Sequence, residues 1–414
     1  TFHKISTDAP LEDYDYKAIA TLDATQKKEL NKRNRQLVLE LNQKFLDEMV
    51  NSENQLREKM AFFWQGHFAV RIQNAAFNEQ LLNILREHAL GSFKNLLLKV
   101  SKAPAMLQFL NNQQNKKGHP NENFAREVME LFTMGRGNYS EEDIKESARA
   151  FTGWGYEKSG EFIFKEIQHD GGTKAFLGQT GNFNGDDIIN IILEQKITAK
   201  FITTKIYRFF VNETPDKDII EHLSDSFYHS GYDIKRLMQD IFTSDWFYDV
   251  KNIGAKIKSP IELIAGIMRI LPMDIGNKDS LILYQKLLGQ RLFAPPNVAG
   301  WPMGKDWIDS SSLILRMQLP QIMSGIRPLD YMPQADDDLD MGIMGKQKIN
   351  KLTKNAKINI DWNSIESTLS GKDLFEILLQ HIGSLKSIKL NNYYTKSTRE
   401  NIINIMSTPE YQLC

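Results

Sequence analysis

The fold is decided by residues 121–154, which read NENFAREVMELFTMGRGNYSEEDIKESARAFTGW. Apolar residues recur at helical spacing after Asn121, which follows Pro120 and is of a type that begins helices. We therefore expect a helix over 122–133 that buries Phe124, Val128, Leu131 and Phe132. A second helix is expected after Ser140, because the acidic residues 141–143 suit the positive end of a helix dipole.

Helical periodicity continues on both sides of this stretch. It predicts further helices at 24–48, 54–71, 78–90, 92–101, 103–110, 186–195, 197–210, 216–229, 232–243, 259–271, 279–288, 309–324, 373–382 and 396–406. Residues 153–178 break the pattern, because alternating residues on either side of Ser159 and Gly160 are typical of a small β-hairpin.

The domain organisation follows from these elements. The polar stretch 328–354, with its acidic run at 336–338, is typical of a linker or long loop. We expect an all-α fold with a large multi-helix domain over 1–327, which carries the hairpin insertion at about 153–178. A C-terminal helical extension is expected over 355–414.

Composition narrows the classes of function. The 414 residues include 51 Lys and Arg against 52 Asp and Glu, and this balance does not favour nucleic acid as a partner. Cys414 is the only cysteine, which excludes an internal disulfide and cysteine-based zinc sites. The sequence has no apolar run of about 18 residues, so no transmembrane helix is expected.

His67 is the first candidate for chemistry. It falls on the most apolar stripe of its helix, together with Leu56, Met60, Phe63 and Val70. A histidine in that position needs a partner for each ring nitrogen. One interpretation is a core histidine bonded to a carbonyl or carboxylate, and the other is a metal ligand or a general acid–base group.

Glu127 and Glu130 are candidate carboxylates on the helix expected at 122–133. They are three residues apart and point the same way, as paired ligands or an acid–base pair would require. Glu127 lies nearer the apolar border and can line a cleft. The alternative is a solvated face, on which Arg126 and Glu130 form an ordinary ion pair.

His169 and Asp170 precede two glycines, Gly171 and Gly172, in a loop that can present side chains to a pocket. Arg149 and Lys174 are the candidate sources of positive charge beside them. The alternative is a local turn in which Asp170 caps backbone amides.

Four of these candidates have side chains of the types that bind zinc, manganese or iron, namely His67, Glu127, Glu130 and His169. Their spacing along the chain is not diagnostic of a metal site. The motifs of serine hydrolases, zincins, P-loop proteins and dinucleotide-binding proteins are absent. Catalysis, if present, would depend on Glu127, His169, Asp170 and Arg149.

Tryptophans in loops suggest a different kind of site. Trp154, Trp301 and Trp307 lie in segments rich in glycine and proline, where an indole ring can stack on a sugar. Trp154, Trp301 and Lys174 are therefore weaker candidates for ligand binding. The alternative is that these rings pack the loops that carry them.

The chain resembles a bacterial family known as domain of unknown function 1800, from about residue 55 to the end. The resemblance rests on the shared order of eight strings: 63–68 (FWQGHF), 121–127 (NENFARE), 148–154 (ARAFTGW), His169 and Asp170 followed by Lys174 and LG at 177–178, 205–210 (KIYRFF), 258–262 (KSPIE), 296–302 (PNVAGWP) and 408–413 (TPEYQL). It implies a mostly helical, exported protein of the periplasm or cell envelope. It brings no established activity or catalytic residue set.

The resemblance also suggests a partner, because such proteins are often encoded beside the family domain of unknown function 1501, which is similar to alkaline phosphatases and sulfatases. Three functions therefore stay open. The first is a metal-assisted enzyme, hydrolytic in type, whose metal is not identified. The others are a helical scaffold that docks on the phosphatase-like protein, and a glycan-binding module that uses the tryptophan loops.

Overall fold

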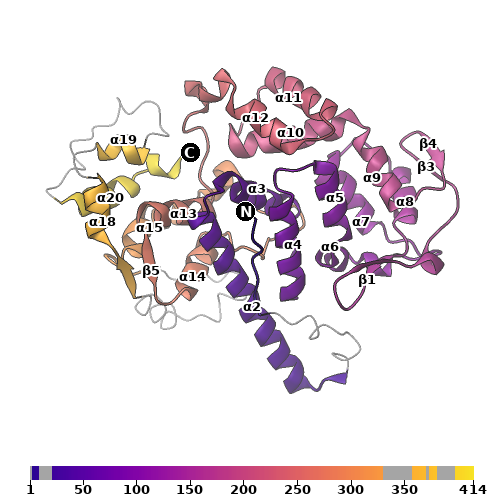
Figure 1. Ribbon diagram of the computed structural model, residues 1–414, viewed down its shortest axis with the longest axis horizontal. Coiled ribbons are helices and arrows are strands. Elements are labelled where there is room, and N and C mark those ends of the chain that lie inside the picture. The colour runs from indigo at the N-terminus through magenta and orange to yellow at the C-terminus, as the bar shows by residue number, and fades with distance from the viewer. Residues whose placement is uncertain (1, 9–20, 330–356, 370–372, 380–396) are drawn as a thin grey trace. The chain divides into compact units, whose positions relative to one another are not determined.

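The computed structural model describes residues 2–8, 21–329, 357–369, 373–379 and 397–414 (Figure 1). Within these residues the chain is mostly helical, with three short two-stranded sheets. The expected all-α fold with a hairpin insertion is thus confirmed. Most of the expected linker at 328–354, with its acidic run, lies outside the described residues, as does the end of the helix expected at 373–382.

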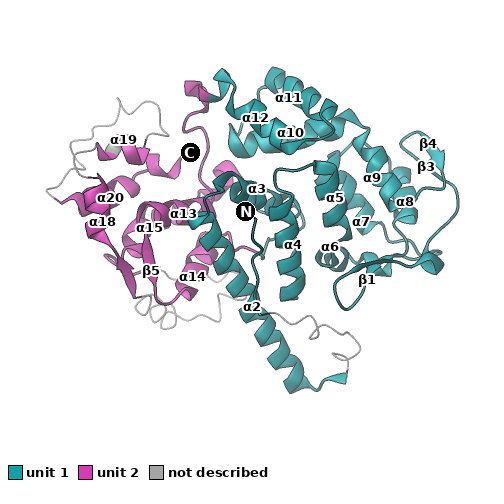
Figure 2. Ribbon diagram, viewed as in Figure 1, with its two compact units in different colours: residues 1–247, 293–301 teal, residues 248–292, 302–414 magenta. Residues whose placement is uncertain are grey.

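Contacts divide the chain into two compact units, which Figure 2 shows in teal and magenta. Unit 1 contains Thr1–Phe247 and Phe293–Trp301, and unit 2 contains Tyr248–Leu292 and Pro302–Cys414. The sequence-based division into 1–327 and 355–414 stays a prediction, because the segment between these parts is almost entirely outside the described residues.

Unit 1 is formed mainly by α-helices. Their bounds are α2 Ala24–Asn51, α3 Gln55–His67, α4 Ala75–Glu87, α5 Phe93–Lys102, α6 Pro104–Phe109, α7 Glu122–Glu127, α8 Glu141–Ala150, α9 Gly185–Leu193, α10 Lys196–Phe210, α11 Lys217–His229 and α12 Ile234–Phe242. Helix α8 begins as expected, because Ser140 and Asp143 form a capping box in which each side chain accepts a bond from the other's backbone amide.

The helix expected over 122–133 changes geometry halfway. It is α-helical over α7 and then becomes a π-helix, η3 Val128–Thr133. The Thr133 hydroxyl donates to the carbonyl of Val128 at 2.6 Å, five residues earlier, which matches the wider π turn. Phe124, Val128 and Phe132 are buried as expected, whereas Leu131, which was also expected to be buried, is partly exposed.

Two hairpins stand where one was expected. Strand β1 Trp154–Tyr156 pairs with β2 Phe162–Phe164, and β3 Lys174–Phe176 pairs with β4 Gln179–Gly181, both antiparallel. The single-turn helix η4 Glu166–Gln168 lies between the two hairpins along the chain. Sequence alternation identified the first hairpin, whereas the second has only three residues in each strand and gives little periodic signal.

The segment 2–8 docks on unit 1 through buried polar groups. Arg86 of α4 bonds Glu58 of α3 at 2.7 Å, and both side chains are 1% exposed. The same guanidinium donates to the carbonyl of His3 at 2.9 Å. The Asn83 amide exchanges bonds of 2.9 and 2.7 Å with the backbone of Ile5, which is buried. The start of the chain is therefore part of the folded unit.

Unit 2 is also helical. Its elements are α13 Pro260–Ile270, α14 Asp279–Leu287, α15 Ser310–Met323, α18 Trp362–Leu369, α19 Leu374–Leu379 and α20 Thr398–Met406, with β5 Met273–Ile275 paired antiparallel to β6 Ile358–Ile360. Sequence periodicity did not predict α18 or this sheet. The segment after α20 returns to the residues before α13, where Lys256 and Cys414 exchange backbone bonds of 3.1 and 2.7 Å. In the part of the chain that the structure describes, no helix is long and apolar enough to span a membrane.

Candidate functional site

The imidazole of His67 and the ammonium group of Lys205 meet beside the end of η3. Lys205 Nζ lies 3.1 Å from His67 Nδ1 and 3.2 Å from the carbonyl oxygen of Leu131. His67 Nε2 lies 3.1 Å from the carbonyl oxygen of Phe132. Because a carbonyl only accepts, Nε2 carries the proton and Nδ1 accepts a bond from Lys205. Three elements, α3, α10 and η3, are thus joined by one polar cluster.

The π-helical turn explains why side chains bond these carbonyls. The amides of Met134 and Gly135 both donate to the carbonyl of Met129, at 2.9 and 3.1 Å. The carbonyls of Leu131 and Phe132 are therefore left without a backbone donor at the end of the helix. Lys205 and His67 replace those donors.

Burial determines the charges in this cluster. Desolvation lowers the pKa of His67 well below 6.5, and the nearby charge of Lys205 lowers it further. Burial also lowers the pKa of Lys205 to about 8, while the ring of Phe201 lies 4.9 Å from its Nζ. His67 is therefore a neutral core histidine with a partner on each nitrogen, and a metal would have to displace one of those partners.

Glu127 is the one of the two candidate carboxylates that lies in an unusual environment. It is partly buried and has no hydrogen-bond or ion-pair partner among the described residues. Burial raises its pKa, the charge of Glu130 raises it further, and Arg126 opposes the shift. Glu127 is thus suited to hold a proton nearer neutral pH than an ordinary glutamate.

Glu130 and Arg126 do not form the ion pair that was considered for them. Glu130 accepts a bond of 2.9 Å from the Tyr139 hydroxyl and lies 3.3 Å from Arg136 Nε. Arg126 instead pairs with Glu141 of α8 at 2.9 Å. The helix becomes a π-helix at 128, so residues four apart across this point no longer lie above one another.

Arg149 and Asp170 form a clamp between α8 and the loop after η4. Arg149 Nε donates to Asp170 Oδ2 at 2.8 Å, and its Nη1 donates to Glu146 Oε1 at 2.8 Å. Hydrogen bonding to Arg149 lowers the pKa of Asp170 to about 2. Asp170 also accepts a bond of 2.9 Å from the amide of Gly172, as expected for a turn-capping aspartate. These charges are satisfied by one another, so they hold the loop in place.

His169 and Lys174 complete the same loop. His169 Nδ1 lies 3.0 Å from the carbonyl oxygen of Thr152, so Nδ1 carries the proton and Nε2 keeps a lone pair. His169 is partly exposed, and its Nε2 has no partner among the described residues. Lys174 is 1% exposed and donates to the carbonyls of Asp170 and Gly172 at 2.5 and 2.9 Å. Lys174 therefore supports the loop and is not available to an external ligand.

The clamped loop also carries exposed apolar side chains. Ile167 on η4 is 97% exposed and Phe164 at the end of β2 is 42% exposed. The amide of Lys117 donates to the carbonyl of Gln168 at 2.8 Å, which fixes the loop from another side. The ring of Phe164 packs edge-on to His169, with centroids 5.0 Å apart.

The tryptophans are mostly inside the protein. Trp154 is 3% exposed and packs against the rings of Phe151 and Phe162, with centroids 5.1 and 5.3 Å away. Its ring face is therefore not available to stack on a sugar, which corrects the weaker expectation for this residue. Trp307 is 6% exposed. Trp301 is partly exposed, so it is the one of these three that can touch a ligand.

The four expected metal ligands are not assembled. Within the described residues, no group of three or more His, Cys, Asp or Glu side chains could hold a metal ion. His67 is buried with both nitrogens engaged, whereas His169 lies on the clamped loop. A metal site built from His67, Glu127, Glu130 and His169 therefore has no support in the geometry.

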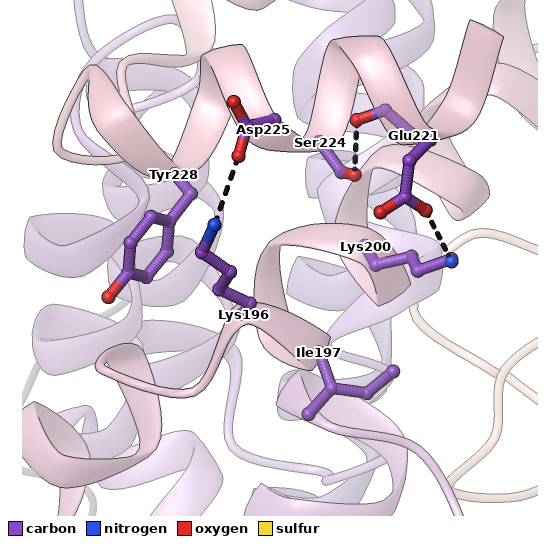
Figure 3. A pocket seen from close by; sticks show the side chains of 7 residues that line it. All are labelled: Lys196, Ile197, Lys200, Glu221, Ser224, Asp225 and Tyr228. Atoms are coloured by element: carbon purple, nitrogen blue, oxygen red, sulfur yellow. Dashed lines mark hydrogen bonds and ion pairs between the residues drawn. The ribbon is translucent and has the colours of Figure 1, made fainter. Parts of the chain in front are cut away.

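A surface hollow of about 140 Å³ lies between α10 and α11 (Figure 3). Its lining consists of Lys196, Ile197, Lys200, Glu221, Ser224, Asp225 and Tyr228. Lys196 pairs with Asp225 at 3.1 Å and Lys200 with Glu221 at 2.5 Å, as the dashed lines show. Because these exposed charges neutralise one another across the mouth, the hollow offers no unpaired group to a ligand.

Lys205 and Thr152 were not singled out for chemistry from the sequence. The signal for Lys205 was its position between Phe201 and Phe209, each four residues away, which places an ammonium group on an apolar helix face. Thr152 has no comparable signal, because its bonds to residues 169 and 170 depend on how a distant loop folds back.

The family model described as "Protein of unknown function (DUF1800)" matches residues 3–413, and the chain belongs to that family. The match begins well before residue 55, where the sequence resemblance was expected to start, and it includes the docked N-terminal segment. Comparison with curated proteins and with solved structures gave no match.

Proposed function

We propose that this member of the family is an exported helical binding protein, and that its loop at 164–170 makes the contact with a protein partner. The observation that carries the proposal is the side chain of Ile167, which is 97% exposed on a loop held from several sides. Phe164 adds a second exposed apolar side chain to the same loop.

Rigidity is what makes this loop suited to binding. Association is opposed by the entropy lost when loops become ordered, and a loop that is already fixed loses less. The bond from Arg149 to Asp170 and the bond between His169 and Thr152 supply that order before any partner arrives. Single exposed apolar residues are common on proteins, but two together on a clamped loop form an anchor of the kind that interfaces bury.

The partner in this proposal is the phosphatase-like protein suggested by the sequence resemblance. Its role would be to receive Ile167 and Phe164 in an apolar pocket, while the charged groups of the clamp stay bonded to one another. The functional assignment is therefore a scaffold that docks on an envelope enzyme and has no reaction of its own.

Binding between the two purified proteins tests this proposal. Burying an isoleucine side chain contributes about 1.5–3 kcal/mol, so Ile167→Asp is expected to weaken binding by at least about tenfold. Ile314→Asp is the matched control, because Ile314 is 58% exposed but lies on α15. Absence of binding by the wild type, or equal losses in the two variants, would contradict the proposal.

A hydrolytic enzyme that uses acid–base chemistry is the second candidate, and Glu127 is the observation that favours it. This carboxylate is partly buried, has no partner among the described residues and has a raised pKa, as an acid–base group requires. The lone pair on His169 Nε2 is the other available group. Hydrolysis of a model ester or phosphate ester by the purified protein, lost in Glu127→Gln, would favour this candidate over the scaffold.

A further inference from the structure

The hairpin that carries Phe164 has one open edge. Strand β1 packs against α6 and the single-turn helix η2 Asn112–Gln114, and the carbonyl of Trp154 accepts a bond of 3.4 Å from the Asn112 side chain. Strand β2 forms the other edge, because this sheet has only the two strands. Every residue of β2 is partly or fully exposed. The hairpin therefore presents the outer edge of β2 to solvent.

Hydrogen bonds at the two ends of the hairpin show which backbone groups point to that edge. Beside the turn, the amide of Glu157 donates to the carbonyl of Glu161 at 2.8 Å. At the other end, the amide of Lys165 donates to the carbonyl of Gly153 at 2.8 Å. In an antiparallel pair, bonded residue pairs alternate with non-bonded ones, so only every second position of a strand bonds across the hairpin.

This alternation assigns each position of β2. Ile163 bonds to β1, because it lies two residues from both Glu161 and Lys165. Phe162 and Phe164 are the positions between, so their amide and carbonyl groups point to the open edge. Among the residues that the structure describes, none bonds to these four groups. The edge thus offers two donors and two acceptors at the two-residue repeat of an extended chain, about 7 Å apart.

The side chains around this edge are apolar and continue to the docking loop. Phe164 is 42% exposed, and Phe162 and Ile163 are partly exposed. Ile167, which is 97% exposed, follows three residues after β2 ends. The other hairpin differs, because its strand β4 consists of Gln179, Thr180 and Gly181 and has no apolar side chain. The unbonded edge of β2 is therefore continuous with the apolar anchor of the loop.

We propose that the partner adds an extended segment to the open edge of β2. The segment bonds Phe162 and Phe164 through its own main chain, and its alternate side chains pack beside the ring of Phe164. A strand is the occupant that fits, because its amides and carbonyls alternate at the same two-residue repeat, whereas an apolar pocket alone leaves the four groups unbonded. This inference rests on the scaffold function proposed above and specifies what the phosphatase-like partner presents to the loop.

Hydrogen exchange of the full chain, with and without the purified phosphatase-like protein, tests the strand addition directly. Mass spectrometry with fragmentation of the exchanged peptides reads single amides. In the free protein the amides of Phe162 and Phe164 should exchange quickly and that of Ile163 slowly, since only Ile163 is bonded within the hairpin. We expect the complex to slow exchange at Phe162 and Phe164 by at least about tenfold, because both amides become bonded.

A pair of substitutions at one position gives the second test. Phe164→Pro removes both the aromatic ring and the amide hydrogen, whereas Phe164→Ala is the matched control that removes the ring alone. Proline is tolerated at an edge position whose amide faces solvent, so both variants should keep the circular dichroism spectrum of the wild type. We expect Phe164→Pro to bind the partner at least about fivefold more weakly than Phe164→Ala, because a carbonyl of the added strand loses its donor.

Equal affinities of the two variants, or unchanged exchange at Phe162 and Phe164 in the complex, would overturn the strand addition. If Phe164→Pro does not fold, the exchange comparison on the wild type decides by itself. Where strand addition fails but Ile167→Asp still weakens binding, the docking loop stands, whereas absence of binding by the wild type contradicts both proposals. Protection of the two amides that rises with the concentration of this protein alone would assign the edge to a second copy and refute the partner's strand.

Discussion

Replacing His67 with leucine distinguishes a structural histidine from a metal ligand. The substitution removes the donor to the Phe132 carbonyl and the acceptor for Lys205, which lie 3.1 Å from the two ring nitrogens. Leucine fills most of the space but makes neither bond. His67→Leu therefore leaves the Phe132 carbonyl unbonded, and Lys205 keeps only its bond to the Leu131 carbonyl.

The expected loss of stability follows from these two groups. The unbonded carbonyl costs about 1–3 kcal/mol and the bond lost by the charged ammonium group about 1.5–3 kcal/mol, so His67→Leu should lower the free energy of unfolding by about 2.5–6 kcal/mol. His229→Leu is the control, because the His229 side chain is 62% exposed and bonds only within its own helix. That change should stay within about 0.5 kcal/mol.

The pH dependence gives a second, independent signature. Burial holds the pKa of His67 well below its unfolded value of 6.5, so below pH 6.5 the unfolded chain binds a proton that the folded chain does not. The stability due to this residue is complete above pH 6.5 and falls by up to about 1.4 kcal/mol for each pH unit below it. The difference in stability between wild type and His67→Leu should therefore shrink as the pH falls through this window.

Denaturant unfolding followed by circular dichroism, at several pH values, measures both effects. Elemental analysis of the same samples reports whether any metal depends on His67. A loss below about 1 kcal/mol, or a difference from wild type that does not change with pH, would refute the role we assign to this histidine. Loss of a stoichiometric metal with unchanged stability would make His67 a ligand instead.

Two further substitutions test the packing around the candidate sites. Arg86→Met should lower the free energy of unfolding, measured in denaturant, by about 3–5 kcal/mol, because it leaves the buried carboxylate of Glu58 unpaired. The control is Arg399→Met, which should cost under about 1 kcal/mol, because the side chains of its ion pair are 46% and 38% exposed. Similar losses in the two variants would refute the distinction. Gly300→Ala should lower the melting temperature more than Gly231→Ala does. Both glycines have positive φ (88° and 70°), but only at Gly300 would the added Cβ lie 2.4 Å from the backbone of Gly66. Equal shifts in melting temperature would mean that this close approach does not matter.

Local sequence patterns were sufficient to predict most of the helices. The capping box of Ser140 and Asp143 and the apolar spacing after Asn121 each involve neighbours within one or two turns, and the structure places helices at both. The π-helix was missed because its widened turn is stabilised from outside, by the side chains of His67 and Lys205. No spacing rule within 122–133 contains that information.

The candidate site was predictable in its residues but only partly in its contacts. Arg149 and Lys174 were both expected beside Asp170, and the structure shows Arg149 bonded to its carboxylate at 2.8 Å. Lys174 donates instead to the backbone carbonyls of Asp170 and Gly172. The proposed grouping of His67 with His169 would have required two distant segments to meet. The contacts that decide otherwise, with Lys205 and Thr152, are long-range and leave little trace in the sequence.

The strings that carry the family resemblance differ in what their polar residues do in the structure. Those at 63–68 and 205–210 meet at the end of η3, where His67 and Lys205 bond carbonyls that the π turn leaves open. The roles of His67 and Lys205 are therefore explained by folding. The string at 296–302 differs, because the indole Nε1 of Trp301 is buried and has no hydrogen-bond partner. A polar group that the fold does not use is better explained by a ligand or a reaction than by packing, which is why the unpaired Glu127 is a better guide to function here than His67.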